Sequence, residues 1–326
     1  MKRMSVILAL LVLALVVGAC GRSDSQESTT VKFMLDWVPN TNHTGIFVAQ
    51  DKGYFEEAGV DLEIIEPGEV YPEGAVASGA ADLGISFQES VTLARAEDAP
   101  IVSVAAVLQH NTSGFASLSD LDVTGPADFE GLRYGAWGSP SEAPTLQALM
   151  DCSGADFSAL EMVTTGFADP IALLAEEQAD LVWIYYGWQG FQAEQAGLDI
   201  DVVMMEDYFD CVPDFYTPVV IASESTVAER PNMVEAVLEA LSRGYTYAAE
   251  NPDEAADILL AAVPELDDKL VRESQRWLSS YYIAEAPRWG EQEEHVWQDY
   301  ADWMAENGIL SMPLVADEAF TNEFLP

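Results

Sequence analysis

The stretch LDWVPNTNHTGIFVAQDKGYFEEAGVDLEI, residues 35–64, carries the most unusual cluster of side chains in the chain. It follows an apolar run, VKFML (31–35), and ends in a second run, VDLEII (60–65), with a helical pattern over 45–57 between them. This alternation of short apolar runs with helical patterns predicts α/β layers with mostly parallel sheets. Directly after the first predicted strand come an acid, an indole, two amides and an imidazole: Asp36, Trp37, Asn40, Asn42 and His43.

The same alternation continues to about Ser223, after which the pattern becomes nearly all helical. Further strands are expected at DLGIS (82–86), IVSVAAV (101–107), LRYGAW (132–137), LEMVTT (160–165), DLVWIYY (180–186), DIDVVMM (199–205) and TPVVIAS (217–223). Further helices are expected at 87–97, 140–152, 168–178, 188–196, 231–252, 252–263 and within 269–307. With 49% hydrophobic residues, the chain is long enough for two lobes, each with its own core.

The opening MKRMSVILALLVLALVVGAC (1–20) has two basic residues, an apolar run from Val6 to Val17 and small residues before Cys20. This order is typical of an export signal. The last four residues resemble the lipobox of bacterial lipoproteins, which implies a signal peptide at 1–19, lipid on Cys20 and a polar tether at 20–30. The alternative is an uncleaved anchor helix. Either arrangement places the folded domain outside the cytoplasm.

The three cysteines and three histidines restrict the possible chemistry. If Cys20 carries lipid, Cys152 and Cys211 remain as a possible disulfide pair in an oxidising compartment, or as two free thiols. None of the histidines stands in a CxxC or HExxH spacing, so no metal site and no metal catalysis are predicted.

The chain is extremely acidic, with 56 Asp and Glu against 13 Lys and Arg and a formal net charge of −43. Such a surface repels nucleic acid and anionic lipid headgroups, so neither is an expected partner. The simplest interpretation is a solvated acidic face that keeps an exported protein soluble.

Several segments together resemble the ThiY and NMT1-like group of solute-binding proteins. These segments are residues 35–64, GAADLGISFQESVTLARAEDAPIVSVAAVLQH (79–110), FEGLRYGAWGSPSEAPTLQALM (129–150), DLVWIYYGWQGFQAEQ (180–195) and DFYTPVVIASE (214–224). The resemblance implies a type II periplasmic-binding fold with two α/β lobes, two crossing strands and a ligand cleft. Lobe one would comprise residues 31–122 plus 219–326, and lobe two residues 123–218. It also implies delivery of a thiamin pyrimidine precursor to the permease and ATPase subunits of an ABC transporter, without a cofactor. We expect a monomer.

Within that fold, Asp36, Trp37, Asn40 and His43 would follow strand one and face the cleft. A 4-aminopyrimidine needs aromatic walls and hydrogen-bond acceptors, and Asp36 could form a charge-assisted bidentate contact with it. The alternative is that Asp36 and Asn40 cap the helix that begins near Thr44 and that Trp37 packs between the lobes.

Gln88 and Glu89 open a helix after the strand that ends in GIS, so they face either a ligand or the helix end. Ser139 lies in GAWGSPSEA (135–143), which resembles a strand-to-helix turn with an anion site. Glu142 in its first turn would oppose a phosphate and favours a neutral or cationic solute, although it also suits the helix dipole.

The remaining candidates are aromatic. Tyr185, Tyr186 and Trp188 end a buried strand, whereas Trp183 is expected in the core. Tyr216 lies at the crossover between the lobes, where it could close over a ligand.

The family also contains eukaryotic pyrimidine synthases, which consume their own pyridoxal phosphate and a histidine. Ser86 and Ser90 stand where that branch has a lysine and a histidine, and VPDFY (212–216) stands where it has a cysteine-rich stretch. These departures argue against an enzyme. The sequence therefore predicts a receptor for formylaminopyrimidine or hydroxymethylpyrimidine, the alternatives being a riboflavin, sulfonate or taurine receptor.

Overall fold

The computed structural model describes residues 28–326 except 69, 167 and 313. The predicted signal peptide and the predicted lipid site at Cys20 lie outside the described residues. Among the residues that are described, no helix has both the length and the apolar composition of a membrane span.

The first sheet has five strands in the order β2-β1-β3-β10-β4. Four of them run parallel to one another, and β10 is antiparallel to both of its neighbours. Their bounds are β1 Thr29–Met34, β2 Val60–Ile65, β3 Leu83–Ser86, β4 Ile101–Ala106 and β10 Val219–Ser223.

The second sheet repeats this plan with five strands in the order β7-β6-β8-β5-β9. Here β5 is the antiparallel strand, between β8 and β9. Their bounds are β5 Ser113–Leu118, β6 Arg133–Ala136, β7 Glu161–Thr164, β8 Leu181–Tyr185 and β9 Ile200–Met204. Each sheet is therefore mixed, with four strands that run parallel to one another and one antiparallel strand, so the predicted parallel arrangement holds for four strands of five. Each antiparallel strand is the first strand after the chain crosses between sheets.

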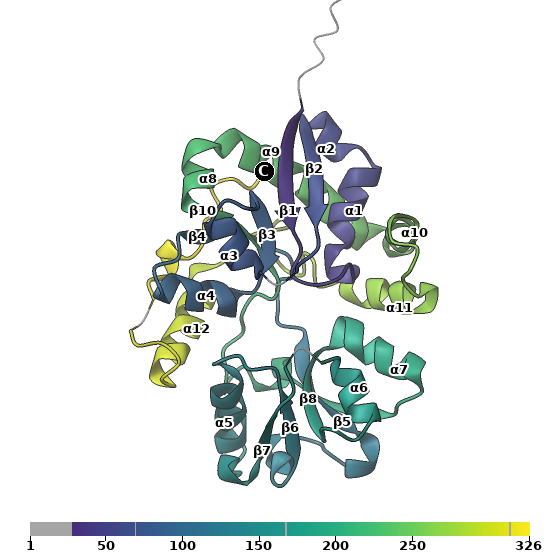
Figure 1. The fold of residues 1–326 in the computed structure, drawn as a ribbon, viewed down its shortest axis with the longest axis vertical. Coiled ribbons are helices and arrows are strands. Elements are labelled where there is room, and N and C mark those ends of the chain that lie inside the picture. The colour runs from purple at the N-terminus through teal and green to yellow at the C-terminus, as the bar shows by residue number, and fades with distance from the viewer. Residues whose placement is uncertain (1–27, 69, 167, 313) are drawn as a thin grey trace, which may run out of the picture.

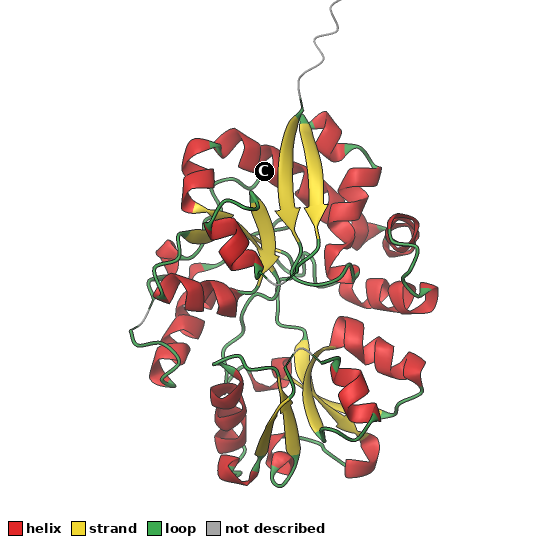
Figure 2. Cartoon of the chain, viewed as in Figure 1, coloured by secondary structure: helices red, strands yellow, loops and turns green. Residues whose placement is uncertain are grey.

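Figures 1 and 2 show the two sheets one above the other, in separate lobes joined by crossing segments. Lobe one contains the first sheet and lobe two the second. The first crossover segment, residues 107–112, joins β4 to β5, and the second, residues 205–218, joins β9 to β10. The predicted boundary at residue 122 falls after β5, whereas hydrogen bonding places β5 in the second sheet, so the division lies within residues 107–112.

Helices cover both faces of each sheet because successive side chains point to opposite faces and the central strands β3, β10 and β8 are mostly apolar and buried on both. On one face of the first sheet pack α1 Thr44–Asp51, α2 Tyr54–Glu57, α9 Pro231–Glu250, α10 Pro252–Ala262 and α11 Asp268–Leu278. On its other face pack α3 Pro72–Ala77, α4 Gln88–Ala96 and α12 Glu294–Glu306, while α8 Glu224–Glu229 follows β10. Lobe two has α5 Glu142–Cys152 on one face and α6 Pro170–Ala175 with α7 Phe191–Ala196 on the other.

The helix α12 contributes to the cores of both lobes. Trp297 and Ala301 pack in the lobe-one cluster that includes α3 and α4. Tyr300, Trp303 and Met304 pack in the lobe-two cluster that includes α5. The two sets occupy adjacent faces of the helix, so one element packs against both lobes beside the crossover segments.

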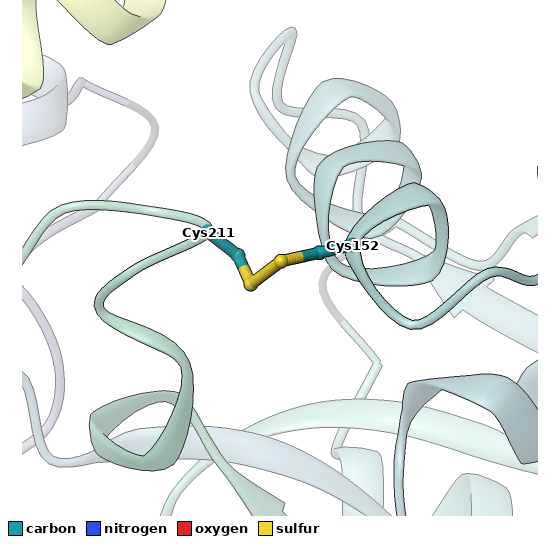
Figure 3. The surroundings of a disulfide bond; sticks show 2 residues. All are labelled: Cys152 and Cys211. Atoms are coloured by element: carbon teal, nitrogen blue, oxygen red, sulfur yellow. A yellow bond between two sulfur atoms is a disulfide. The ribbon is translucent and has the colours of Figure 1, made fainter.

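A disulfide joins Cys152 at the end of α5 to Cys211 in the second crossover segment (Figure 3), with a Cα–Cα distance of 6.0 Å. Of the two alternatives left by the sequence, the pair is therefore the one present. The bond closes a span of 59 residues in lobe two and ties the start of the second crossover segment to a core helix.

Candidate functional site

The two lobes meet where β1 and β3 end in lobe one and β6 and β8 end in lobe two. Glu89 accepts hydrogen bonds across this boundary from the hydroxyls of Ser139 (2.7 Å) and Ser141 (2.5 Å). Next to them the rings of Phe87 and Tyr185 stack, with centroids 5.8 Å apart and planes at 13°. We call the group formed by Asp36, Glu73, Phe87, Glu89, Ser139, Ser141 and Tyr185 the interlobe site.

The segment after β1 holds Asp36 in a defined orientation. The Asn40 side chain accepts from the Asn42 N–H at 2.9 Å, and the Asn40 N–H donates to His43 Nδ1 at 3.2 Å. Because Nδ1 is an acceptor, the ring proton lies on Nε2, which donates to Asp36 Oδ1 at 2.6 Å. Asn40 thus caps the short 3₁₀ turn Thr41–His43, whereas the helix that begins at Thr44 has no side-chain cap, so the capping alternative is wrong for that helix. His43, fully buried, positions Asp36.

Trp37 has an exposed fraction of 46%, and neighbouring Val38 one of 50%. Trp37 therefore does not pack into the core. Its indole remains available as an apolar wall at the edge of the lobe-one strands.

Three carboxyl groups of lobe one lie close enough to influence one another: Asp36, Glu73 and Glu89. Burial raises the pKa of Glu73, which accepts a hydrogen bond from the Ser86 hydroxyl, and the charge of Asp36 raises it further. Burial likewise raises the pKa of Glu89, with smaller contributions from neighbouring carboxylates. Within the described part of the chain, no lysine or arginine forms an ion pair with any of the three.

Glu142 lies on the lobe-two side, 1% exposed, at the first position of α5. One carboxylate oxygen accepts from the Tyr134 hydroxyl at 2.8 Å and the Trp137 N–H at 3.1 Å. The other accepts from the N–H groups of Gly138 at 2.7 Å and Ser139 at 2.8 Å. The predicted anion site at this helix start therefore exists, and the protein's own carboxylate occupies it.

The aromatic candidates divide between the site and its surroundings. Tyr185 belongs to the interlobe site, where burial and then the Glu89 charge raise its pKa. The Tyr186 ring lies at the lobe boundary, 5.2 Å from the ring of Trp277 on α11. Trp188 is partly buried against the lobe-one core, and Trp183 is buried in the lobe-two core as expected.

Two of the predicted ligand residues have their polar groups bound by the protein. Gln88, fully buried, donates to the Val296 carbonyl at 3.0 Å and accepts from the Tyr216 N–H at 2.8 Å. Tyr216 is 2% exposed, and its hydroxyl accepts from the Glu293 N–H at 2.9 Å. This geometry gives both a structural role, as a brace between the second crossover segment and the start of α12.

Sequence reasoning did not select four residues at or beside the site: Glu73, Ser86, Phe87 and Ser141. Ser86 and Phe87 stand at the carboxyl end of β3, the same signal that identified Asp36 after β1. Glu73 had no such signal, because the short α3 that carries it was not predicted.

No group of three or more His, Cys, Asp or Glu within the described residues is arranged to hold a metal ion. The interlobe site consists of carboxylates, hydroxyls and aromatic rings, which suit an aromatic solute rich in hydrogen-bond donors.

Comparison with known proteins gives three findings. The sequence profile of the family described as NMT1/THI5 like matches residues 40–255. The chain is 32% identical to the formylaminopyrimidine-binding protein of Halalkalibacterium halodurans, over 97% of this chain and 98% of that one. It is 26% identical to a 4-amino-5-hydroxymethyl-2-methylpyrimidine phosphate synthase of Legionella pneumophila, over 74% and 76% of the respective chains.

Among solved structures, the periplasmic aliphatic sulphonate binding protein SsuA of Escherichia coli superposes with a TM-score of 0.66. The match has 16% sequence identity and covers 89% of this chain and 91% of that one. This likeness confirms the predicted two-lobed periplasmic-binding fold.

Proposed function

This chain belongs to the NMT1/THI5-like family, and we propose that it is the solute receptor of an ABC importer. Its solute would be a thiamin pyrimidine precursor, formylaminopyrimidine or hydroxymethylpyrimidine. The periplasmic-binding fold supports a receptor outside the cytoplasm. Anchoring through lipid on Cys20, docking on permease and ATPase subunits, and a monomeric state belong to the same proposal.

The observation that carries the proposal is the set of carboxyl groups at the interlobe site without basic partners. An aminopyrimidine offers an exocyclic amino group and, next to a carboxylate, a protonated ring nitrogen. Asp36 is held through Oδ1 by His43, and Oδ2 has no partner among the described residues. A pyrimidine bound there would place its donors against Asp36 and its ring against an aromatic wall.

The neighbouring charges argue against anionic solutes. A sulfonate or phosphate group would meet Asp36, Glu73 and Glu89, and the N–H groups at the start of α5 are taken by Glu142. A pyridoxal phosphate-dependent synthase is disfavoured for the same reason, and Ser86 and Ser90 offer neither the lysine nor the histidine of that branch.

Thermal unfolding with a panel of solutes tests the proposal: both pyrimidines, riboflavin, taurine and pyridoxal phosphate. A ligand that binds only the folded state adds about 2.7 kcal/mol at one hundred times its Kd. We expect a rise in the unfolding midpoint with a pyrimidine and none with taurine or pyridoxal phosphate. A response to taurine or pyridoxal phosphate alone would refute the proposed solute class.

A further inference from the structure

The start of α5 forms a cradle of N–H groups around one carboxylate. Trp137, Gly138 and Ser139 donate three successive backbone N–H groups to Glu142, over 2.7 to 3.1 Å. Gly138 has φ of +108°, a conformation that L side chains rarely adopt, and its N–H is one of the three donors. Successive N–H groups arranged in this way form an anion-binding nest.

This arrangement exceeds what a helix dipole requires. An acid in the first turn of a helix is normally exposed and worth a fraction of a kcal/mol. Glu142 instead is 1% exposed, accepts hydrogen bonds on both oxygens and also accepts one from the hydroxyl of Tyr134, itself fully buried. With four donors around its buried carboxylate, Glu142 takes the place that a bound anion would occupy.

The nest adjoins the interlobe site through one residue. Ser139 donates its N–H to Glu142 and its hydroxyl to Glu89. A phosphate or sulfonate on a solute in this site would need the donors that Glu142 already occupies, and it would face the charge of Glu89 as well.

We propose that Glu142 determines solute specificity by acting as a resident anion. Its carboxylate fills the oxyanion position of the α5 nest and excludes solutes that carry phosphate, sulfate or sulfonate. Removal of the carboxylate exposes a nest that binds small oxyanions. The link to solutes rests on the proposed function, whereas occupancy of the nest does not.

Chemical rescue of Glu142→Ala tests the nest. We expect the variant to unfold at a lower temperature than the unaltered protein, and millimolar formate to restore at least half of the lost midpoint along a saturable curve. Sodium chloride at equal ionic strength should restore none of it. Some salts stabilise any folded protein. Each rise in the unfolding midpoint of the variant is therefore compared with the rise that the same salt produces in the unaltered protein.

Asp169→Ala is the matched control. Asp169 also caps a lobe-two helix, accepting from the N–H groups of Ile171 at 2.8 Å and Ala172 at 3.0 Å. Unlike Glu142, Asp169 is exposed, and its other oxygen accepts from the Gln192 side chain. We expect destabilisation without rescue by formate. Equal formate responses in the Glu142 and Asp169 variants, or equal responses to formate and chloride, would refute the claim that Glu142 occupies an anion-binding nest.

Two further measurements complete the test. If Glu142→Ala does not fold, Glu142→Ser replaces it, because the short serine side chain also vacates the oxyanion position, and a gain of sulfate binding by calorimetry relative to the unaltered protein is expected. Taurine binding is then measured on whichever variant folds, and a gain of at least tenfold supports the specificity role. Rescue by formate without any gain for taurine would overturn that role. Because no pyrimidine is used, failure of the proposed pyrimidine function would leave these results unchanged.

Discussion

Replacement of His110 by glutamine should weaken the connection between the two crossover segments in a pH-dependent way. His110 lies in the first segment, and its Nδ1 is 2.6 Å from Asp214 Oδ2 in the second. Its Nε2 is 3.0 Å from Glu285 Oε1 in the loop between α11 and α12. With a carboxylate at each nitrogen, and Glu206 also nearby, the ring is stabilised as the doubly protonated cation.

The size and sign of the effect follow from the pKa of His110. The hydrogen bond to Asp214 is the main cause that raises this pKa from 6.5 to about 9. At about 1.36 kcal/mol per pH unit the shift sets an upper limit of about 3.4 kcal/mol. The side chain is 33% exposed, so solvent screening lowers our expectation to about 1 kcal/mol. A raised pKa in the folded protein stabilises fully below pH 6.5, and the contribution disappears as pH rises through about 9.

The assay is urea unfolding of the unaltered protein and of His110→Gln between pH 6 and pH 10. We expect the difference in unfolding free energy to be largest at pH 6, to shrink above pH 6.5 and to become constant above about pH 9. His295→Gln is the control, because His295 is 66% exposed beside Glu293 and should give a small difference throughout. A His110 difference that does not change with pH would refute the reasoning.

Three further predictions concern other parts of the molecule. Replacing Cys152 and Cys211 by serine should lower the unfolding free energy by about 4 kcal/mol, since the bond closes 59 residues; an unchanged urea midpoint would contradict this. Gly244→Ala should lower the unfolding free energy by about 1–3 kcal/mol, because a methyl group on α9 would overlap the backbone of α1. Gly74→Ala is its control: the added methyl group would have no neighbour closer than 3.8 Å, so the unfolding free energy should hardly change. Asp36→Asn should weaken pyrimidine binding at least about tenfold by calorimetry, since a charge-assisted contact is lost, and undiminished affinity would exclude Asp36 from the ligand contacts.

Most of the fold was predictable because apolar runs bounded by turn residues mark nine of the ten strands in the described chain. The exception is β5, whose sequence SGFASL resembles a turn. Gly114 is required there because an added methyl group would lie 2.7 Å from the Val203 carbonyl on β9. Because the close approach to β9 requires a small residue, β5 lacks the β-branched residues that identify a strand. The strand was therefore not predicted, and the lobe boundary was placed after it.

The single helix predicted over 45–57 is also divided. Gly53 has φ of +73° and separates α1 from α2. The periodicity of apolar residues continues across this turn, so the sequence pattern alone does not reveal the break.

At the site, the rule that ligands bind beyond the carboxyl ends of strands was sufficient to select Asp36, Glu89 and Ser139. It could not distinguish a polar side chain that faces a solute from one that braces the lobes. Gln88 and Glu89 are adjacent in sequence, yet the former bonds to α12 and the second crossover segment while the latter meets lobe two. That distinction depends on tertiary partners that lie between 50 and 208 residues away in the sequence.

The carboxyl groups that would bind a pyrimidine also oppose burial between the lobes when no ligand is present. Burial of Glu89 beside Glu142 and Glu73 raises its pKa, which means that its charged form is destabilised in this arrangement. A solute that brings hydrogen-bond donors or positive charge would remove that cost, so solute binding and lobe contact would favour each other.

Glu89→Gln separates these two effects. Glutamine keeps an oxygen that can accept from the Ser139 and Ser141 hydroxyls but removes the buried charge. We therefore expect the ligand-free variant to unfold at a higher temperature than the unaltered protein and to bind a pyrimidine more weakly. Thermal unfolding with and without the pyrimidine measures both quantities in one experiment. A buried charge that opposes lobe contact and attracts the solute must affect the unfolding temperature and the pyrimidine affinity in opposite directions. If Glu89→Gln raised both or lowered both, the Glu89 carboxyl group would not be what links solute binding to lobe contact.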